Sequence, residues 1–149
     1  MIKIYRSLLL FIIIFNYSCE QPCGECFTPP EPFIFEIADK TSGENLFTKG
    51  IYKASEIEVI DLSDSSRVDY TFIDENDINL IQIHTIGWKT ETVNYSINIS
   101  NKNIFNLYVD AERISEDCCS YTEFHEIKIE NTEYEFNQET GIYKILIEL

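Results

Sequence analysis

The five cysteines of this chain are its residues best suited to chemistry, and three of them lie close together near the N-terminus. Cys19, Cys23 and Cys26 fall within the stretch FNYSCEQPCGECFTPPEP, whereas Cys118 and Cys119 form an adjacent pair far along the chain. Thiols at such spacings can be acylated, joined as disulfides, bound to zinc or used in redox exchange. The choice among these depends on the compartment in which the chain folds and on the elements that position the sulfurs.

The N-terminal segment predicts export. Lys3 and Arg6 precede the apolar run LLLFIIIF at residues 8–15, and no acidic residue appears before Glu20. A basic start followed by a short apolar run is typical of a secretory signal peptide. The run is less than half of the roughly 20 apolar residues that a membrane-spanning helix needs. Residues 1–18 are therefore predicted to be a signal peptide that is removed.

Cys19 follows this run at the distance of a lipobox cysteine. The segment resembles the signal of bacterial lipoproteins, a resemblance that implies cleavage before Cys19, a thioether-linked diacyl group on its sulfur and acylation of the new amino group. Several acyl chains, at ~0.8 kcal/mol per buried CH₂, hold a protein stably on a membrane. The expected location is the bacterial cell envelope, on the periplasmic or the surface face of the outer membrane. An ordinary secreted protein cut near the same place is the alternative.

The charge of the chain restricts its partners. The full sequence contains 11 basic and 26 acidic side chains, with a formal charge of −15. Loss of Lys3 and Arg6 with the signal peptide changes the formal charge to −17. Nucleic acids and anionic lipid surfaces attract clusters of Lys and Arg, so neither is expected to bind this chain directly. The acidic excess is expected to keep the domain soluble, and the lipid has to provide the attachment.

Alternating apolar and polar residues predict strands throughout the chain after residue 32. The clearest is VNYSINIS at residues 93–100, which is followed by the turn SNKN and by FNLYVD, and the two segments are predicted to form a hairpin. The pattern recurs in PFIFEIA, EIEVIDL, RVDYTFI, INLIQIHT, YTEFHEIKIE and IYKILIEL. With no long amphipathic helical stretch, this predicts an all-β fold, an antiparallel β-sandwich of about seven to nine short strands.

The positions of the prolines predict where the domain begins. All four lie between Pro22 and Pro32, and none interrupts a predicted strand. Because proline cannot donate to a strand ladder, residues 19–32 are predicted to form an extended, semi-rigid stalk. Residues 33–149 are then the sandwich domain.

If Cys19 carries lipid, four cysteines remain for disulfides in an oxidising compartment. Three connectivities are open. A bond between Cys118 and Cys119 closes a strained ring, whereas a bond from the stalk to either of them closes a loop of about 90 residues, worth on the order of 4 kcal/mol. Two bridges that join Cys23 and Cys26 to this pair are therefore favoured.

Two other uses of the cysteines are disfavoured. The CGEC stretch has the spacing of a thioredoxin-like redox pair, but FTPPEP follows it in place of the helix that would activate a thiolate. A zinc site requires ligands that can surround the ion, and the adjacent Cys118 and Cys119 have no spacer between them. No metal and no cofactor are expected.

The sequence predicts no catalytic residue. Its two histidines, His84 and His125, are not accompanied by a GxSxG or HExxH motif. Acidic clusters at residues 61–64 and 74–77 contain the paired carboxylates that a glycosidase or a calcium site would use. Acidic residues are common at the tips of solvated turns, and that is the role expected for these.

The segment DKTSGENLFTKGIY at residues 39–52 is more particular. Together with CFTPPEPFIFEI, DCCSY and the closing GIYKILI, it is similar to a family of small bacterial envelope lipoproteins of unassigned function. The resemblance implies structural features, namely turn glycines and bridging cysteines, and brings no activity with it. Side-chain-capped turns are expected at Asp39, Glu44 and Asn45. Leu46 and Phe47 are expected to return the loop to the core.

Two functional hypotheses follow. The favoured one is a non-catalytic binding or structural module on a lipid anchor, which binds another envelope protein or a glycan. It is based on the absence of a catalytic constellation and on the aromatic residues expected outside the core, which are Trp88, Tyr108, Tyr121 and Tyr134. A contiguous patch of these residues would strengthen it, and their full burial would count against it. The alternative is an accessory enzyme or enzyme-inhibitor domain that uses acidic loop residues. It requires two acidic side chains in one concave pocket, one of them with a raised pKa.

Overall fold

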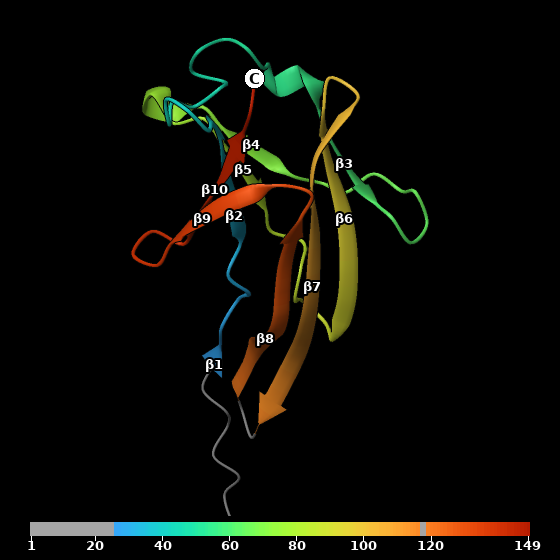
Figure 1. Cartoon of the computed structure of the whole chain (residues 1–149). Coiled ribbons are helices and arrows are strands. Elements are labelled where there is room, and N and C mark those ends of the chain that lie inside the picture. Colours follow the sequence, from blue (N-terminus) through green and yellow to red (C-terminus); the bar gives the residue numbers. More distant parts are fainter. Residues whose placement is uncertain (1–25, 117–118) are drawn as a thin grey trace, which may run out of the picture.

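The computed structural model describes residues 26–116 and 119–149, which fold into two five-stranded sheets (Figure 1). Sheet A contains, in spatial order, β1 (Cys26–Phe27), β8 (Cys119–Glu130), β7 (Lys102–Glu116), β6 (Glu91–Ile99) and β3 (Ile57–Asp61). Sheet B contains β4 (Thr71–Ile73), β5 (Leu80–Ile83), β2 (Phe33–Asp39), β10 (Ile142–Ile147) and β9 (Glu133–Asn137). Two single 3₁₀ turns, η1 (Ala54–Glu56) and η2 (Glu75–Asp77), are the helical elements of the described residues.

The predicted all-β sandwich is confirmed, with two differences in detail. The described residues form ten strands, and β7 is 15 residues long. Each sheet also contains one parallel pair, because β10 runs parallel to β2 and β1 runs parallel to β8. The predicted hairpin is the antiparallel pair of β6 and β7. No helix in the described part of the chain is long and apolar enough to span a membrane.

The core lies between the two sheets and follows the predicted alternation. On β2, Phe33, Phe35 and Ile37 point inward, and the ring of Phe35 lies 4.8 Å from that of Phe105 on β7, centroid to centroid. The largest side chains with essentially no exposed surface are Phe35, Phe105, Ile37, Leu46, Ile81, Ile83, Ile86, Ile97, Ile99, Leu107 and Ile145. Strands from both sheets and two loops, which contribute Leu46 and Ile86, thus form a single core.

The loop after β2 has two of the three expected side-chain caps, at Asp39 and Asn45, whereas the carboxylate of Glu44 pairs with Lys49. A carboxylate oxygen of Asp39 accepts the N–H groups of Thr41 at 2.7 Å and of Ser42 at 3.1 Å. The side-chain oxygen of Asn45 likewise accepts the N–H of Phe47 at 2.9 Å. Leu46 is fully buried, so the loop returns to the core where the sequence predicts it.

The N-terminal end of the described chain is fastened to sheet A. A disulfide joins Cys26 to Cys119, one of the stalk-to-domain bridges favoured above. Beside it, the N–H of Thr28 donates to the carbonyl of Ser120 at 2.9 Å. Among the described residues, Cys26 is the first that joins a sheet, seven positions before the expected start of the domain.

The remaining predictions for this end of the chain lie outside the described residues. They are the signal peptide at residues 1–18, the lipid on Cys19, the first part of the stalk, and the bridging roles of Cys23 and Cys118.

Candidate binding site

The β9–β10 hairpin carries a cluster of exposed aromatic rings. Its register places Phe136 opposite Tyr143 and Tyr134 opposite Ile145. The ring of Phe136 stacks on that of Tyr143 with centroids 4.4 Å apart, and the ring of Tyr134 lies 6.0 Å from the same tyrosine. Phe136 is nevertheless 47% exposed and Tyr134 is 43% exposed.

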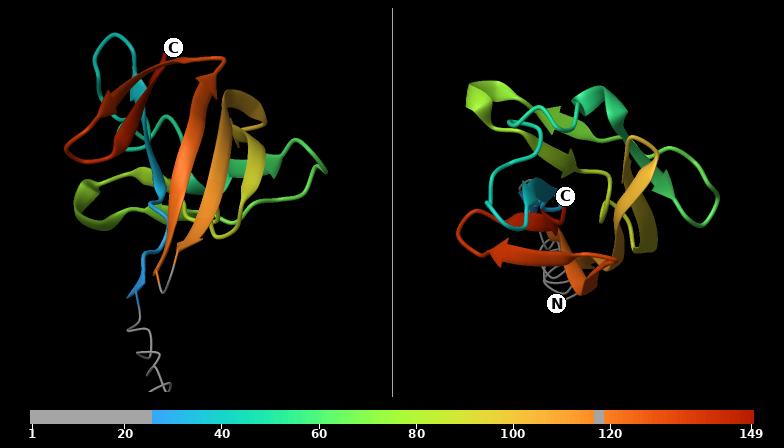
Figure 2. Two further views of the ribbon diagram at one scale, coloured as in Figure 1. Left: turned by 90° about the horizontal axis from the view of Figure 1, so that it is seen from below. Right: turned by 45° about the horizontal axis from the view of Figure 1, so that its top comes forward.

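The exposure of these rings follows from the way the two sheets diverge. Tyr134 and Phe136 share a face with Ile145, which is fully buried, so they lie on the side of sheet B that faces the core. Figure 2 shows the hairpin of β9 and β10 projecting away from β8, the nearest strand of sheet A. The core-facing side of β9 is therefore left partly uncovered, whereas Ile145 of β10 is buried.

A groove of about 380 Å³ lies in this opening. One wall is formed by Phe124 and Ile127 of β8 and the other by Phe136 and the turn at residues 138–141. Tyr143 and Phe33 complete the apolar lining, and the ring of Phe33 packs edge-on against Phe124 at 5.2 Å. We call this site the aromatic groove.

Polar groups form the rim of the aromatic groove. Glu31 lies on one side, and Gln138, Glu139 and Thr140 lie in the turn on the other. The side-chain oxygen of Asn137 fixes this turn by accepting the N–H groups of Glu139 at 2.9 Å and of Thr140 at 3.2 Å. Apolar walls with a few positioned polar groups are typical of binding sites.

A second exposed aromatic pair lies beside β1. Phe27 is stacked on Trp88 with ring centroids 6.0 Å apart, and the guanidinium of Arg113 lies 4.9 Å from the Phe27 ring. Arg113 also donates to the carbonyl of Thr28 at 2.8 Å and to the hydroxyl of Thr122 at 2.9 Å. These contacts fasten the segment that follows β1, so the pair has a structural role.

The four aromatic residues singled out from the sequence do not form one patch. Trp88 contacts Phe27, whereas Tyr134 belongs to the cluster on the hairpin. Tyr108 is half-buried beneath Lys128, and Tyr121 is also half-buried. Sequence reasoning missed the rings of the groove itself, which are Phe33, Phe124, Phe136 and Tyr143. The alternation in EYEFN and IYKILI was the available signal, but only the pairing register brings these rings together.

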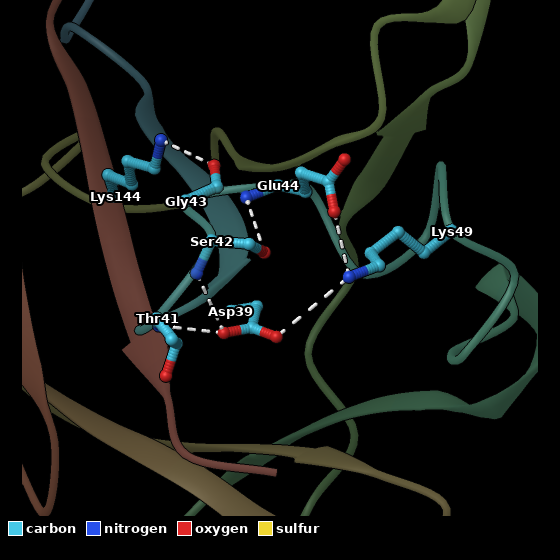
Figure 3. Close-up of polar contacts among 7 residues, drawn as sticks. All are labelled: Asp39, Thr41, Ser42, Gly43, Glu44, Lys49 and Lys144. Atoms are coloured by element: carbon cyan, nitrogen blue, oxygen red, sulfur yellow. Dashed lines mark hydrogen bonds and ion pairs between the residues drawn. The ribbon is translucent and has the colours of Figure 1, made fainter.

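The polar contacts of the acidic loop after β2 stabilise the conformation of the loop (Figure 3). Hydrogen bonds from the N–H groups of Ser42 and Thr41 lower the pKa of Asp39, and Lys49, 3.9 Å away, lowers it further. A hydrogen bond from Lys49, at 2.8 Å, lowers the pKa of Glu44. The enzyme alternative needs a carboxyl group with a raised pKa, and these shifts have the opposite sign.

Other candidate groups likewise show structural contacts. Hydrogen bonds from Ser66 lower the pKa of Asp64 in the first acidic cluster. The exposed His125 lies 2.8 Å from a carboxylate oxygen of Glu112, and this hydrogen bond raises the pKa of the imidazole. Within residues 26–116 and 119–149, no three His, Cys, Asp or Glu side chains are grouped so as to hold a metal ion.

No protein-family model, curated protein or solved structure matches this chain. Function is therefore inferred from the chemistry of the aromatic groove.

Proposed function

We propose that this chain is a lipid-anchored, non-catalytic binding module of the bacterial cell envelope, and that it binds an apolar segment of another protein in the aromatic groove. The observation that carries the proposal is the partly uncovered, core-facing side of β9, where Phe136 and Tyr134 remain nearly half exposed. Full burial of an exposed large apolar side chain is worth about 1.5–3 kcal/mol. Because these rings are 43–47% exposed, a partner that covers them would gain about half of that free energy for each ring.

A protein partner fits the groove better than a glycan does. The walls are side chains that continue the domain core, and the polar groups are confined to the rim. Such a site accepts one or two apolar side chains of a partner, while the rim groups hydrogen-bond its backbone. A volume of about 380 Å³ is sufficient for side chains of that size.

Phe136→Ser is expected to reduce capture of the partner at least tenfold, because it removes one wall of the groove. The full-length chain is immobilised and incubated with a detergent extract of the envelope of the producing organism. Bound proteins are then quantified by mass spectrometry. Trp88→Ser is the matched control, since Trp88 is 51% exposed but lies outside the groove. Thermal unfolding verifies that both variants are folded.

The proposal is supported if a protein is retained by the native chain and by Trp88→Ser but lost from Phe136→Ser. The proposal is wrong if Phe136→Ser retains every molecule that the native chain captures. If a glycan is captured and is lost from Phe136→Ser, the site is correct and the partner is a glycan.

The anchor proposed at Cys19 would hold the β1 end of the domain near the membrane. Cys26 is seven residues after Cys19, and an extended chain of that length spans at most about 25 Å. Cys26 is in turn fixed to sheet A by its disulfide. In Figure 1 the β9–β10 hairpin lies away from the end of the sandwich at which β1 enters. This placement would leave the hairpin accessible to a partner in the envelope.

Intact-mass analysis of the native protein is expected to show a chain that begins at Cys19 and carries acyl groups. Cys19→Ser should move the protein from the detergent phase to the aqueous phase in a detergent partition experiment, because the acyl chains supply the membrane affinity. Cys23→Ser is the control and should leave the partition unchanged. A native protein with an unmodified sulfur at Cys19 contradicts the anchor.

A further inference from the structure

Strand β9 is the open edge of sheet B. All five of its residues are exposed, and within the described part of the chain it pairs only with β10, in one unbroken register. In an antiparallel pair, alternate residues direct their N–H and C=O groups away from the neighbouring strand. β9 therefore presents a row of backbone donors and acceptors to solvent, beside the aromatic groove.

The other strand edges are protected in ways that β9 is not. The chain after β3 folds back along it, with the N–H of Val68 donating to the carbonyl of Val59 at 2.9 Å. β4 has only three residues. At the other edge of sheet A, β1 covers β8 at Cys119 and Ser120, and beyond this pairing β8 contains a bulge at His125. Natural sheets protect their edges by these devices and by charged side chains. β9 has only the last of these, the charges of Glu133 and Glu135, which leaves its backbone edge open to an added strand of complementary charge.

The two faces of β9 have different chemistry. Its sequence EYEFN places Tyr134 and Phe136 on the groove side and Glu133 and Glu135 on the outer side. The outer side borders a hollow of about 730 Å³, which Glu36, Glu135 and Glu139 line together with Lys144. Glu135 takes part in no ion pair within the described residues. Glu133 pairs with Lys40, but both side chains are exposed and such pairs are weak.

A second copy of the chain fits this edge poorly. Two β9 strands that pair antiparallel over their full length, with their aromatic faces on one side, place Glu135 opposite Glu135. Like charges directly opposite one another destabilise a sheet. The formal charge of −15 adds long-range repulsion between copies.

We infer that β9 binds an extended segment of the partner protein as an added strand, one in which Lys or Arg alternates with apolar residues. The basic side chains lie opposite Glu133 and Glu135, and the apolar side chains lie beside Tyr134 and Phe136 at the mouth of the groove. This inference rests on the proposed function, since it names the kind of segment that the groove receives.

The test uses a synthetic peptide, Lys-Phe-Lys-Val-Lys-Phe-Lys with blocked ends, and the full-length disulfide-bonded chain. Binding is measured by calorimetry, and the contact surface is mapped by NMR shifts of the β9 amides. A peptide of the same composition in an order without alternation should bind at least tenfold more weakly. Two analogues N-methylated at odd or at even positions should differ at least tenfold, because only one set of amides faces β9.

The matched protein variants each remove two negative charges. Glu133→Gln/Glu135→Gln is expected to weaken binding about tenfold. Asp74→Asn/Glu75→Gln, at exposed positions in the turn before β5, should change it less than twofold. The inference is overturned if both double variants lose affinity equally, if the scrambled peptide binds as well, or if no peptide binds. A Phe136-dependent partner captured from the envelope would still support the proposed function in each of those cases.

Discussion

Replacement of Cys26 and Cys119 by serine, in a chain whose Cys23 and Cys118 are already serine, is expected to lower the free energy of unfolding by about 4–5 kcal/mol. The disulfide joins residues 93 positions apart, so it restricts the unfolded chain over most of the domain. In the chain-entropy model, the stabilisation grows with the length of the closed loop. Urea denaturation of the oxidised proteins measures the difference.

The native background provides the control. If Cys23 and Cys118 form the second predicted bridge, they close nearly the same loop, so removal of Cys26 and Cys119 alone should cost much less there. The two experiments together therefore report the connectivity. A loss of under 1 kcal/mol in the background without Cys23 and Cys118 would show that the bridge does not restrict the unfolded chain as the model requires.

The local structure of this domain could be predicted from its sequence because each strand has one face in the core. That arrangement imposes a period of two on the apolar residues, and Phe33, Phe35 and Ile37 show it directly. The turns after β2 were equally predictable, because Asp39 and Asn45 cap them by hydrogen bonds within three residues. Interactions of such short range are encoded in short stretches of sequence.

The pairing of strands was not predictable, because alternation gives no information on neighbours or direction. β10 lies parallel to β2, more than 100 residues earlier, and this pairing aligns Tyr143 with Phe35. The aromatic groove depends on that alignment, on the pairing of Phe136 with Tyr143 and on the divergence of the hairpin from β8. Each ring looked like an ordinary core residue or a scattered surface aromatic until its partners were known.

The same distinction explains why the aromatic residues singled out from the sequence do not form one patch. Tyr108 and Tyr121 occupy polar-face positions in their strands, but a lysine side chain covers the first and both are half-buried. Long side chains such as lysine can cover apolar surface with their methylene groups. The exposure of each tyrosine therefore depends on side chains of neighbouring strands, and the sequence of one strand does not specify these neighbours.

Leu46→Ala is expected to lower the free energy of unfolding by about 2–5 kcal/mol, although Leu46 lies in a loop. Its side chain is fully buried in the core. Its N–H donates to the carbonyl of Ile37 at 2.8 Å, and its own carbonyl accepts the N–H of Ile51 at 3.0 Å. Alanine retains these backbone bonds, so the loss measures the buried side chain and the cavity that it leaves. Denaturant unfolding gives the value.

Ile51→Ala, in the same loop, is the control. Ile51 is 43% exposed, and its truncation should cost less than about 1 kcal/mol. If Leu46→Ala were equally mild, the loop would be a separable appendage and the side chain of Leu46 would not be part of the folding core. If the full loss is observed, amide exchange should also accelerate in β2, because Ile37 and Leu46 pack in one core cluster. The loop would then be a structural part of the sandwich, with the same cooperative unfolding as the strands it covers.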